Sequence, residues 1–447
     1  MGTNPEIFKT YDVRGIYGRD FDEKSAYKIG CALAKFTQAE KIVVGRDMRE
    51  SSVLLEKALI EGILDQGVDV VKIGLVSTPM FYFASGRLEV GAGAFITASH
   101  NPAEYNGVKF CRGQAIPIGE GSGMEEIKNL VLEDDFASSL KKGRLEENNA
   151  IQEEYADYLL GFMNTKNKKI KVVFDFGNGM GALDKKIYNR LKKFIDPVYL
   201  YDELDGSFPN HEANPLNTET LKDLQKKLIE EKADLGAALD GDGDRVGFID
   251  EQGEIVPMDF VTALLAKEIL KKNPGSLILF DLRSSNAVKE YIKENGGRAK
   301  HCRVGHSLIK KQMRAEDAIF AGELSGHYFF EENFKAEITP LAVIMLINLL
   351  NESGKKLSEL AKELKRYYHS GEINSEVKNK EEVFQKIKEK YKDGKLNEFD
   401  GVRIDFDDWW LSLRASNTEP KIRLNLEAKN KNLMEEKRDE VLSLIRE

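Results

Sequence analysis

The residues LGAALDGDGDR at 235–245 run from an apolar segment directly into a loop of alternating aspartates. A short apolar run bounded by turn residues predicts a buried strand, and the glycines between the acids let the loop fold tightly. Two other stretches follow the same plan, GAFITASHNP at 93–102 and AIFAGELSGH at 318–327. We therefore expect three buried strands that each enter a polar loop, in three related parts of the chain.

An earlier apolar strand and a helical segment precede each of these strands. The earlier strands are KIVVGRD at 41–47, KVVFDFGNG at 171–179 and SLILFDLRSS at 276–285. Strands that alternate with helices are typical of α/β domains with largely parallel sheets. In open sheets of this kind, ligands bind beyond the carboxyl ends of the strands. The polar loops are therefore the predicted functional regions.

The pattern changes near residue 370 to shorter strand-like segments, followed by a helix predicted at 430–446. The sequence thus predicts three similar α/β domains with mixed, largely parallel sheets and a smaller C-terminal α+β domain. The expected domains span residues 1–149, 150–252, 253–369 and 370–447. The chain has 447 residues, which is enough for several domains of ~100–200 residues each.

Composition and the N-terminal sequence exclude several classes of binding partner and of structural site. The net charge is −9, from 66 basic and 75 acidic residues, which argues against a general affinity for nucleic acid or anionic membranes. Cys31, Cys111 and Cys302 are few and widely spaced, so they predict neither a disulfide framework nor a cysteine zinc site. The N-terminus lacks the features of a secretory signal, and we expect a cytoplasmic protein that is a monomer or a weak homo-oligomer.

The acidic loop predicts a metal site. Asp240, Asp242 and Asp244 alternate with glycines, and carboxylate oxygens suit Mg²⁺ or Ca²⁺. The spacing imitates a calcium-binding EF-hand loop, but Arg245 stands where that loop requires glycine. The preceding segment also has the character of a strand. A magnesium site is the preferred interpretation, and a solvated acidic turn is the alternative.

Ser99 in TASHNP at 97–102 is a candidate nucleophile, with a simple turn residue as the alternative. A serine acts as a nucleophile only when a base activates its hydroxyl. His100 is the next residue in the sequence, and a base in that position is rarely well placed to accept the hydroxyl proton. The G-x-S-x-G elbow of many hydrolases does not surround Ser99. Spacing alone does not decide between these readings.

Two further loops carry polar groups. GELSGH at 322–327 offers Glu323, Ser325 and His327, which suit sugar hydroxyls, although a glycine-bounded turn is the alternative. RASNTEP at 414–420 combines an arginine with small hydroxyl and amide side chains, a set suited to phosphate. Its residues, with a nearby arginine, are Arg414, Ser416, Asn417, Thr418 and Arg423.

The segment DFGNGMGA at 175–182 satisfies a dinucleotide-binding glycine pattern. A tight strand-to-helix turn needs the same glycines, and no second mononucleotide-binding half is evident, so this signal is weak.

Together these segments resemble the α-D-phosphohexomutase superfamily, and within it the bacterial and archaeal phosphomannomutase/phosphoglucomutase branch. The resemblance runs from YDVRG at 11–15 to the C-terminal part and includes FPNHEANPLN at 208–217. It implies four domains around a central cleft. It also implies a mutase that interconverts hexose 1-phosphate and hexose 6-phosphate, of mannose and/or glucose, through a phosphoserine and a bisphosphorylated sugar.

The resemblance also implies residue roles. Ser99 would carry the phosphoryl group and share Mg²⁺ with Asp240, Asp242 and Asp244, and a hexose 1,6-bisphosphate would act as activator. The other residues expected at the reacting centre are Arg14, His100, Lys109, Arg245, His306 and His327. The residues expected to bind substrate are Arg283, Glu323, Ser325, Arg414, Ser416, Asn417, Thr418 and Arg423.

Two alternative functions remain, and the sequence departs from the family pattern at one segment. A phosphoglucosamine mutase would perform the same chemistry on an amino sugar, but such relatives tend to have Gln where Leu324 stands, which favours neutral hexoses. A magnesium-dependent sugar phosphatase would instead release inorganic phosphate. Relatives commonly have Asp followed closely by Gly before the helix after GELSGH, whereas this chain has KAEITPLAV at 335–343. We expect Glu337 to take over that role.

Overall fold

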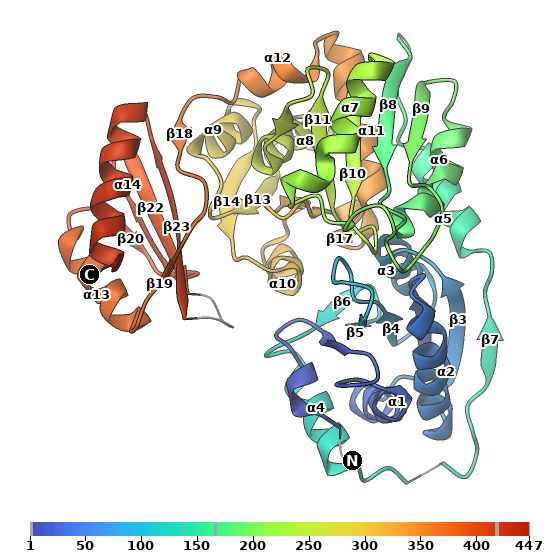
Figure 1. Cartoon of the computed structure of the whole chain (residues 1–447). Coiled ribbons are helices and arrows are strands. Elements are labelled where there is room, and N and C mark those ends of the chain that lie inside the picture. The colour runs from blue at the N-terminus through green and yellow to red at the C-terminus, as the bar shows by residue number, and fades with distance from the viewer. Residues whose placement is uncertain (1–2, 138, 165–167, 416–419, 447) are drawn as a thin grey trace.

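The computed structural model describes residues 3–137, 139–164, 168–415 and 420–446. Four β-sheets follow one another along the chain, each with its own helices. In Figure 1 the first part lies below, the second and third lie side by side above it, and the fourth stands apart at the left. Within the described residues, each helix is too short or too polar to span a membrane.

The first sheet has seven strands, in the order β1-β5-β4-β2-β3-β7 with β6 added beside β5. Its strands are β1 (Val13–Ile16), β2 (Lys41–Arg46), β3 (Asp69–Leu75), β4 (Ala92–Ile96), β5 (Tyr105–Arg112), β6 (Ile116–Ile118) and β7 (Leu145–Glu147). Its helices are η1 (Pro5–Ile7), α1 (Glu23–Thr37), α2 (Glu50–Asp65), α3 (Thr78–Arg87) and α4 (Met124–Glu133).

The second sheet has five strands, in the order β12-β11-β10-β8-β9. Its strands are β8 (Ile170–Asp175), β9 (Ile195–Leu200), β10 (Leu235–Leu239), β11 (Val246–Asp250) and β12 (Ile255–Val256). The helices of this part are α5 (Ile151–Leu160), η2 (Met180–Asp184), α6 (Lys185–Arg190), η3 (Thr218–Leu221) and α7 (Lys222–Glu231).

The third sheet also has five strands, in the order β14-β13-β15-β16-β17. Its strands are β13 (Leu277–Asp281), β14 (Arg298–Cys302), β15 (Phe320–Gly322), β16 (Tyr328–Phe330) and β17 (Ala336–Glu337). Its helices are α8 (Met258–Lys272), α9 (Asn286–Glu294), α10 (His306–Glu316), η4 (Glu331–Asn333), α11 (Thr339–Ser353) and α12 (Leu357–Lys362).

The fourth sheet is antiparallel throughout, in the order β18-β23-β22-β21-β20 with β19 also paired to β23. Its strands are β18 (Tyr368–His369), β19 (Ile373–Glu376), β20 (Lys395–Asn397), β21 (Val402–Asp405), β22 (Trp409–Ala415) and β23 (Lys421–Ala428). The helices α13 (Lys380–Lys390) and α14 (Lys431–Arg446) belong to this part, so the predicted closing helix is present.

The first three sheets share one topology. In each, a central strand pairs in parallel with an earlier strand on one side and antiparallel with the next strand on the other. These central strands are β4, β10 and β15, and the three polar loops connect them to β5, β11 and β16. The prediction of three similar α/β domains with mixed sheets and a smaller α+β domain is therefore confirmed.

Two sheets extend slightly past the expected domain limits. Strand β12 pairs with β11, so the second sheet continues to Val256. Strand β18 pairs with β23, so the fourth sheet begins at Tyr368. Both strands are only two residues long, and such short segments carry no clear period in the sequence.

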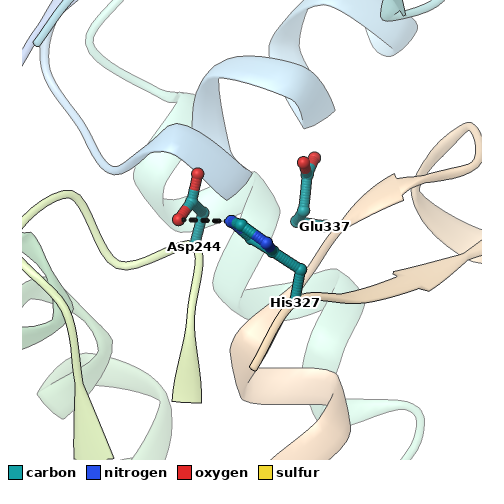
Figure 2. A group of neighbouring side chains, drawn as sticks. All are labelled: Asp244, His327 and Glu337. Atoms are coloured by element: carbon teal, nitrogen blue, oxygen red, sulfur yellow. Dashed lines mark hydrogen bonds and ion pairs between the residues drawn. The ribbon is translucent and has the colours of Figure 1, made fainter. Parts of the chain in front are cut away.

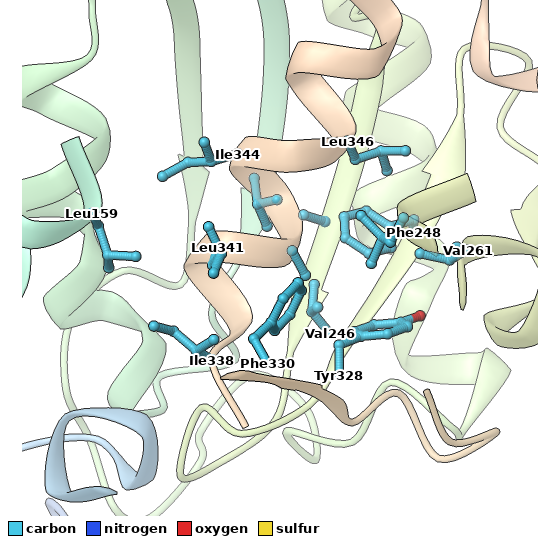
Figure 3. Packing of buried hydrophobic residues seen from close by; sticks show 14 of the residues in the cluster. Leu159, Val246, Phe248, Val261, Tyr328, Phe330, Ile338, Leu341, Ile344 and Leu346 are labelled. Carbon is cyan, nitrogen blue, oxygen red and sulfur yellow. The ribbon is translucent and has the colours of Figure 1, made fainter. Parts of the chain in front are cut away.

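Helix α11 joins the second and third parts. The apolar stretch at 340–350 forms this helix, and its side chains are almost all buried. Figure 3 shows Leu341, Ile344 and Leu346 among side chains of α5, β11 and β16. These residues belong to one continuous hydrophobic cluster, so burial of α11 fixes the two sheets relative to each other.

Candidate active site

Ser99 lies in the β4–β5 connection with its hydroxyl turned toward the acidic loop. The Ser99 Oγ donates to Asp240 Oδ2 at 3.1 Å and lies 3.3 Å from the Nδ1 of His100. Its backbone has φ +50°, in the left-handed region that non-glycine residues rarely adopt. The Ser99 N–H donates to Thr97 Oγ1 at 2.9 Å, which helps to hold this conformation. Strained backbone of this kind is typical of functional loops.

Arg49 holds the Ser99 loop, and sequence reasoning missed it. This arginine is 1% exposed, and its guanidinium donates to the carbonyl oxygens of Ser99 at 2.9 Å and Asn101 at 2.6 Å. It also donates to the carbonyls of Pro102 and Tyr105, at 2.7 and 3.2 Å. A single buried side chain thus fixes four backbone positions around the serine. The available signal was an arginine just after a predicted strand end, in GRDMRE at 45–50.

The acidic loop packs against the same serine. A Cβ atom on Gly241 would collide with the carbonyl oxygen of Ser99. Gly241 therefore allows the two loops to approach closely. The weak dinucleotide signal at 175–182 has the same explanation, because its Gly179 packs against the backbone of Gly241.

Two of the three aspartates, Asp242 and Asp244, pair with Lys109. Asp240, Asp242 and Asp244 are at most 1% exposed, and each offers an oxygen within 4.8 Å of the others. The Nζ of Lys109 donates to Asp242 at 2.7 Å and Asp244 at 2.6 Å, and Thr78 Oγ1 donates to Asp242 at 2.7 Å. The Oδ1 of Asp242 is buried and has no hydrogen-bond partner among the described residues. Clustered carboxylates with an unsatisfied buried oxygen fit a hard divalent cation.

Burial and charge act against each other in this cluster. Burial, with the two neighbouring carboxylates, raises the pKa of Asp240 well above its usual range. Burial also opposes ionisation of Asp244, but the charges of Lys109 and His327 outweigh it and hold the pKa of Asp244 well below the usual range. Burial likewise disfavours charge on Lys109, yet Asp242 and Asp244 raise the pKa of its ammonium group. The positive charge of Lys109 thus offsets the negative charges of Asp242 and Asp244.

Arg245 and Arg14 add positive charge at the two sides of Ser99. The Nε of Arg245 lies 3.6 Å from Asp240 Oδ2. Arg14 donates to Asn101 Oδ1 at 3.0 Å and forms an ion pair with Asp12. Burial and these two arginines lower the pKa of His100 to about 3, so His100 is neutral near pH 7.

The GELSGH loop presents a buried histidine. His327 Nδ1 lies 2.8 Å from Glu323 Oε2, and Ser325 Oγ donates to the same oxygen at 2.6 Å. The Nε2 of His327 lies 3.2 Å from Asp244 Oδ1, as the dashed line in Figure 2 marks. Burial opposes the charge on His327, but Asp244 and Glu323 outweigh it and raise its pKa to about 9. Glu323 and Ser325 therefore support His327 as well as facing the site.

His306 begins helix α10 beside a buried ion pair. Its Nδ1 lies 3.7 Å from Glu337 Oε1, and the two Glu337 oxygens accept from Lys310 Nζ at 3.2 and 3.0 Å. Burial, followed by the charge of Lys310, lowers the pKa of His306 well below its usual range. A neutral imidazole is therefore expected here.

Arg283 lies in a separate cavity. Its guanidinium pairs with Asp281 at 2.6 Å and with Glu372 at 3.4 Å. The cavity has a volume of about 640 Å³, lies where the second, third and fourth parts meet, and includes Ser325 and Leu324 in its lining. The contact of Arg283 with substrate stays a prediction, and the structure places Arg283 with Ser325 in the lining of this cavity.

Arg414 and Arg423 face each other across strands β22 and β23. Their Cα atoms are register partners, and each has a buried Nε without a hydrogen-bond partner among the described residues. Arg414 pairs with Asp400 at 3.2 Å, and Arg423 lies 3.8 Å from Glu372. Two neighbouring guanidinium groups, each with an Nε–H that has no partner in the described part of the chain, fit an anion. The other predicted residues of this loop, Ser416, Asn417 and Thr418, lie outside the described residues.

The structure thus brings most of the predicted residues into two groups. One group gathers the serine loop, the acidic loop and the histidines: Arg14, Ser99, His100, Lys109, Asp240, Asp242, Asp244, Arg245, His306, Glu323, Ser325 and His327. The other joins Arg283 and Arg423 through their shared partner Glu372, with Arg414 beside Arg423.

Known proteins resemble the chain over its whole length. Family models described as phosphoglucomutase/phosphomannomutase match it as alpha/beta/alpha domain I at 5–138, domain II at 153–253, domain III at 257–368 and the C-terminal domain at 372–444. A phosphomannomutase of Methanocaldococcus jannaschii is 43% identical, covering 98% of this chain and 97% of that protein. One from Escherichia coli K12 is 37% identical, with coverages of 98% and 99%.

Solved structures agree with the sequence relatives. A phosphoglucomutase/phosphomannomutase family protein from Burkholderia thailandensis superposes with a TM-score of 0.91 at 30% identity, covering 99% of this chain and 97% of that one. Identity of this level over nearly the full length shows common descent together with a common fold. The chain therefore belongs to the phosphoglucomutase/phosphomannomutase family and is an isomerase that interconverts hexose 1-phosphates and hexose 6-phosphates.

Proposed function

We propose that this mutase works through a phosphorylated Ser99 and prefers mannose phosphates, with glucose phosphates as further substrates. The observation that carries the proposal is the 3.1 Å hydrogen bond between Ser99 Oγ and Asp240, within a buried group of carboxylates and cations. A phosphoryl group on this serine would lie beside Lys109 and Arg245. Relatives named phosphomannomutase at 43% and 37% identity support the choice of mannose.

We assign a magnesium site to Asp240, Asp242 and Asp244, together with the phosphoryl group of Ser99. The unpaired, buried Oδ1 of Asp242 supports this assignment. Bound Mg²⁺ would neutralise charge on the transferring phosphoryl group. Lys109 lies between two of the aspartates without the ion, so its ammonium is positioned to contact the same phosphoryl group.

The reaction requires two phosphoryl transfers. A free sugar hydroxyl attacks the phosphorus of phospho-Ser99, and the bond from phosphorus to Ser99 Oγ breaks. The hydroxyl proton passes to a base, and the leaving Ser99 Oγ takes up a proton to become the free hydroxyl. The product is a bisphosphorylated sugar, which turns around and returns its other phosphate to Ser99.

Lys109, His306 and His327 are the candidates for proton transfer. Arg14 and Arg245 would hold the phosphoryl group, while His100, neutral beside the serine, would donate its Nδ1–H to the serine oxygen. Added hexose 1,6-bisphosphate would restore a phosphate lost from the serine.

The group around Glu372 is the proposed distal half of the substrate site. Arg414 and Arg423, with Ser416, Asn417 and Thr418, would bind the phosphate that is not reacting. Arg283, Glu323 and Ser325 would contact sugar hydroxyls. Glu323 Oε2 is already engaged by Ser325 and His327. Glu323 Oε1 accepts from the Gly305 N–H and keeps a second lone pair for a sugar hydroxyl.

Product analysis tests the proposal. The enzyme is incubated with Mg²⁺, a trace of hexose 1,6-bisphosphate, and the 1-phosphate of mannose, glucose or glucosamine. We expect the 6-phosphates of mannose and glucose, and much less turnover of glucosamine 1-phosphate. Ser99→Ala should remove turnover and leave the circular dichroism spectrum unchanged, and full activity in that variant would refute the role of the serine. Release of inorganic phosphate in place of the 6-phosphate would instead favour a sugar phosphatase.

Several expectations stay predictions. The domain limits at 149, 252 and 369 are tested by limited proteolysis, which should cut in the exposed connections nearest to them, outside the paired strands β12 and β18. The expected monomer or weak homo-oligomer is tested by light scattering, and the cytoplasmic location by cell fractionation.

A further inference from the structure

Lys310 and Glu337 form an ion pair that is fully buried. Both side chains have 0% exposure, and the Nζ of Lys310 donates to the two carboxylate oxygens at 3.0 and 3.2 Å. Lys310 also lies over the ring of Tyr82, 3.9 Å from its centroid. A buried ion pair is weak evidence for stability, because its desolvation offsets much of the attraction. The pair therefore calls for a further explanation.

His306 lies next to this pair and has an unsatisfied nitrogen. The Nδ1 of His306 is buried and has no hydrogen-bond partner within the described part of the chain. Its distance to Glu337 Oε1 is 3.7 Å, which is outside hydrogen-bond range by less than 1 Å. The side chain of His306 keeps 15% of its area exposed. Because Nδ1 itself is buried, this exposure belongs to other atoms of the side chain.

A metal ion is a poor alternative occupant. Glu337 offers an oxygen within 4.8 Å of ligand atoms of Asp244 and His327, and Figure 2 shows the three side chains together. Lys310 already contacts both oxygens of Glu337, however. A cation at this point would be repelled by the buried ammonium group. The arrangement fits a carboxylate that one cation holds in place.

We propose that Glu337, held by Lys310, is a positioning residue for His306. When the site closes on substrate, the N–H at His306 Nδ1 donates to Glu337. That hydrogen bond fixes the tautomer in which Nε2 is unprotonated and can receive the proton of the attacking sugar hydroxyl. The inference rests on the proposed function, because it assigns a task to His306 within that reaction.

Neighbouring contacts connect the Lys310–Glu337 pair to His306 and to the acidic loop. Lys310 lies one turn after His306 on α10, so both side chains are on the same face of the helix. Two residues after Glu337, the Oγ1 of Thr339 donates to the carbonyl oxygen of Gly243 at 2.7 Å. The segment at 335–340 thus contacts both His306 and the acidic loop. Its sequence departs from the pattern expected of relatives, and it supplies the carboxylate that lies beside His306.

The experiment separates positioning from structural support. The double variant Lys310→Met/Glu337→Leu removes both charges and should fold, because apolar replacement of a buried pair is tolerated. We expect its kcat to fall about 10- to 100-fold with KM within about threefold, as for loss of an oriented base. The unfolding midpoint in urea should stay close to that of the wild type. Glu337→Asp is the second variant, since it keeps both charges and its shorter side chain withdraws the carboxylate from His306.

A double-mutant cycle gives the decisive readout. In a His306→Ala background, either change at Glu337 should lower kcat by less than about twofold, because the interaction is already lost. The proposal is overturned if kcat of the double variant equals that of the wild type, or if Glu337 changes have their full effect without His306. A fully active His306→Ala variant would also overturn it, because His306 would then not be the base. Failure of the proposed function is distinct, since the wild-type enzyme would then make no hexose 6-phosphate.

Discussion

Arg49→Lys tests whether one buried arginine sets the position of Ser99, the proposed site of phosphorylation. Arginine has five N–H donors in a planar group, whereas lysine has three on one atom. Arg49 donates to four carbonyl oxygens, so at least one of them must lose its partner in the variant. Hydrogen bonds to charged groups contribute about 1.5–3 kcal/mol each. Loss of one or two of them should destabilise the protein by about 1.5–6 kcal/mol.

The effect on chemistry should exceed the effect on substrate binding. A displacement of about 1 Å at a reacting group lowers rates by up to about 100-fold, so we expect serine phosphorylation to slow by about 10- to 100-fold with KM little changed. The assay follows labelled phosphate from hexose 1,6-bisphosphate to Ser99, alongside urea unfolding. Arg46→Lys is the matched control, because Arg46 contacts Asp47 and Glu56 without touching the Ser99 loop. A normal phosphorylation rate in Arg49→Lys, or equal losses in both variants, would refute the reasoning.

Three further outcomes are expected. Gly241→Ala should cost about 1–3 kcal/mol of stability and lower the phosphoserine content seen by mass spectrometry, because the new Cβ would collide with the Ser99 carbonyl. Chelation of divalent metal should abolish turnover reversibly on adding Mg²⁺ while circular dichroism stays unchanged, since Lys109 covers two of the aspartates. In metal-free protein, the pKa of His327 is raised to about 9 because Asp244 outweighs burial. Its stabilising contribution is therefore complete below about pH 6.5 and lost as the pH rises towards 9, so the urea midpoint should fall over that interval, and less so in His327→Gln.

The sequence predicts the three loops because their signals are local. An apolar run followed by TASHNP, DGDGDR or GELSGH combines a strand pattern with its functional group in about ten residues. The repeated plan also predicts that the loops occupy equivalent positions, and the shared sheet topology agrees with this. Signals of this kind depend on period and turn chemistry, which one sequence displays directly.

The contacts that hold the loops together are not local. Arg49 acts on carbonyls about 50 residues away in the chain, and backbone oxygens have no sequence signature. The position of Lys109 between two aspartates likewise depends on two sheets meeting. Glu337 drew attention only because its segment departs from the pattern expected of relatives. Its ion pair with Lys310 could not be derived from spacing.

The acidic loop is supported by helices from both neighbouring parts of the chain. Helix α3 and helix α11 each begin with a Thr-Pro pair, at Thr78 and at Thr339. The Oγ1 of Thr78 donates to Asp242, and that of Thr339 donates to the carbonyl of Gly243. Helix N-termini carry partial positive charge, so two of them face the buried aspartates from opposite domains. The repeated domains thus supply the reactive loops and also, through the same helix start, part of the positive potential that the central loop requires.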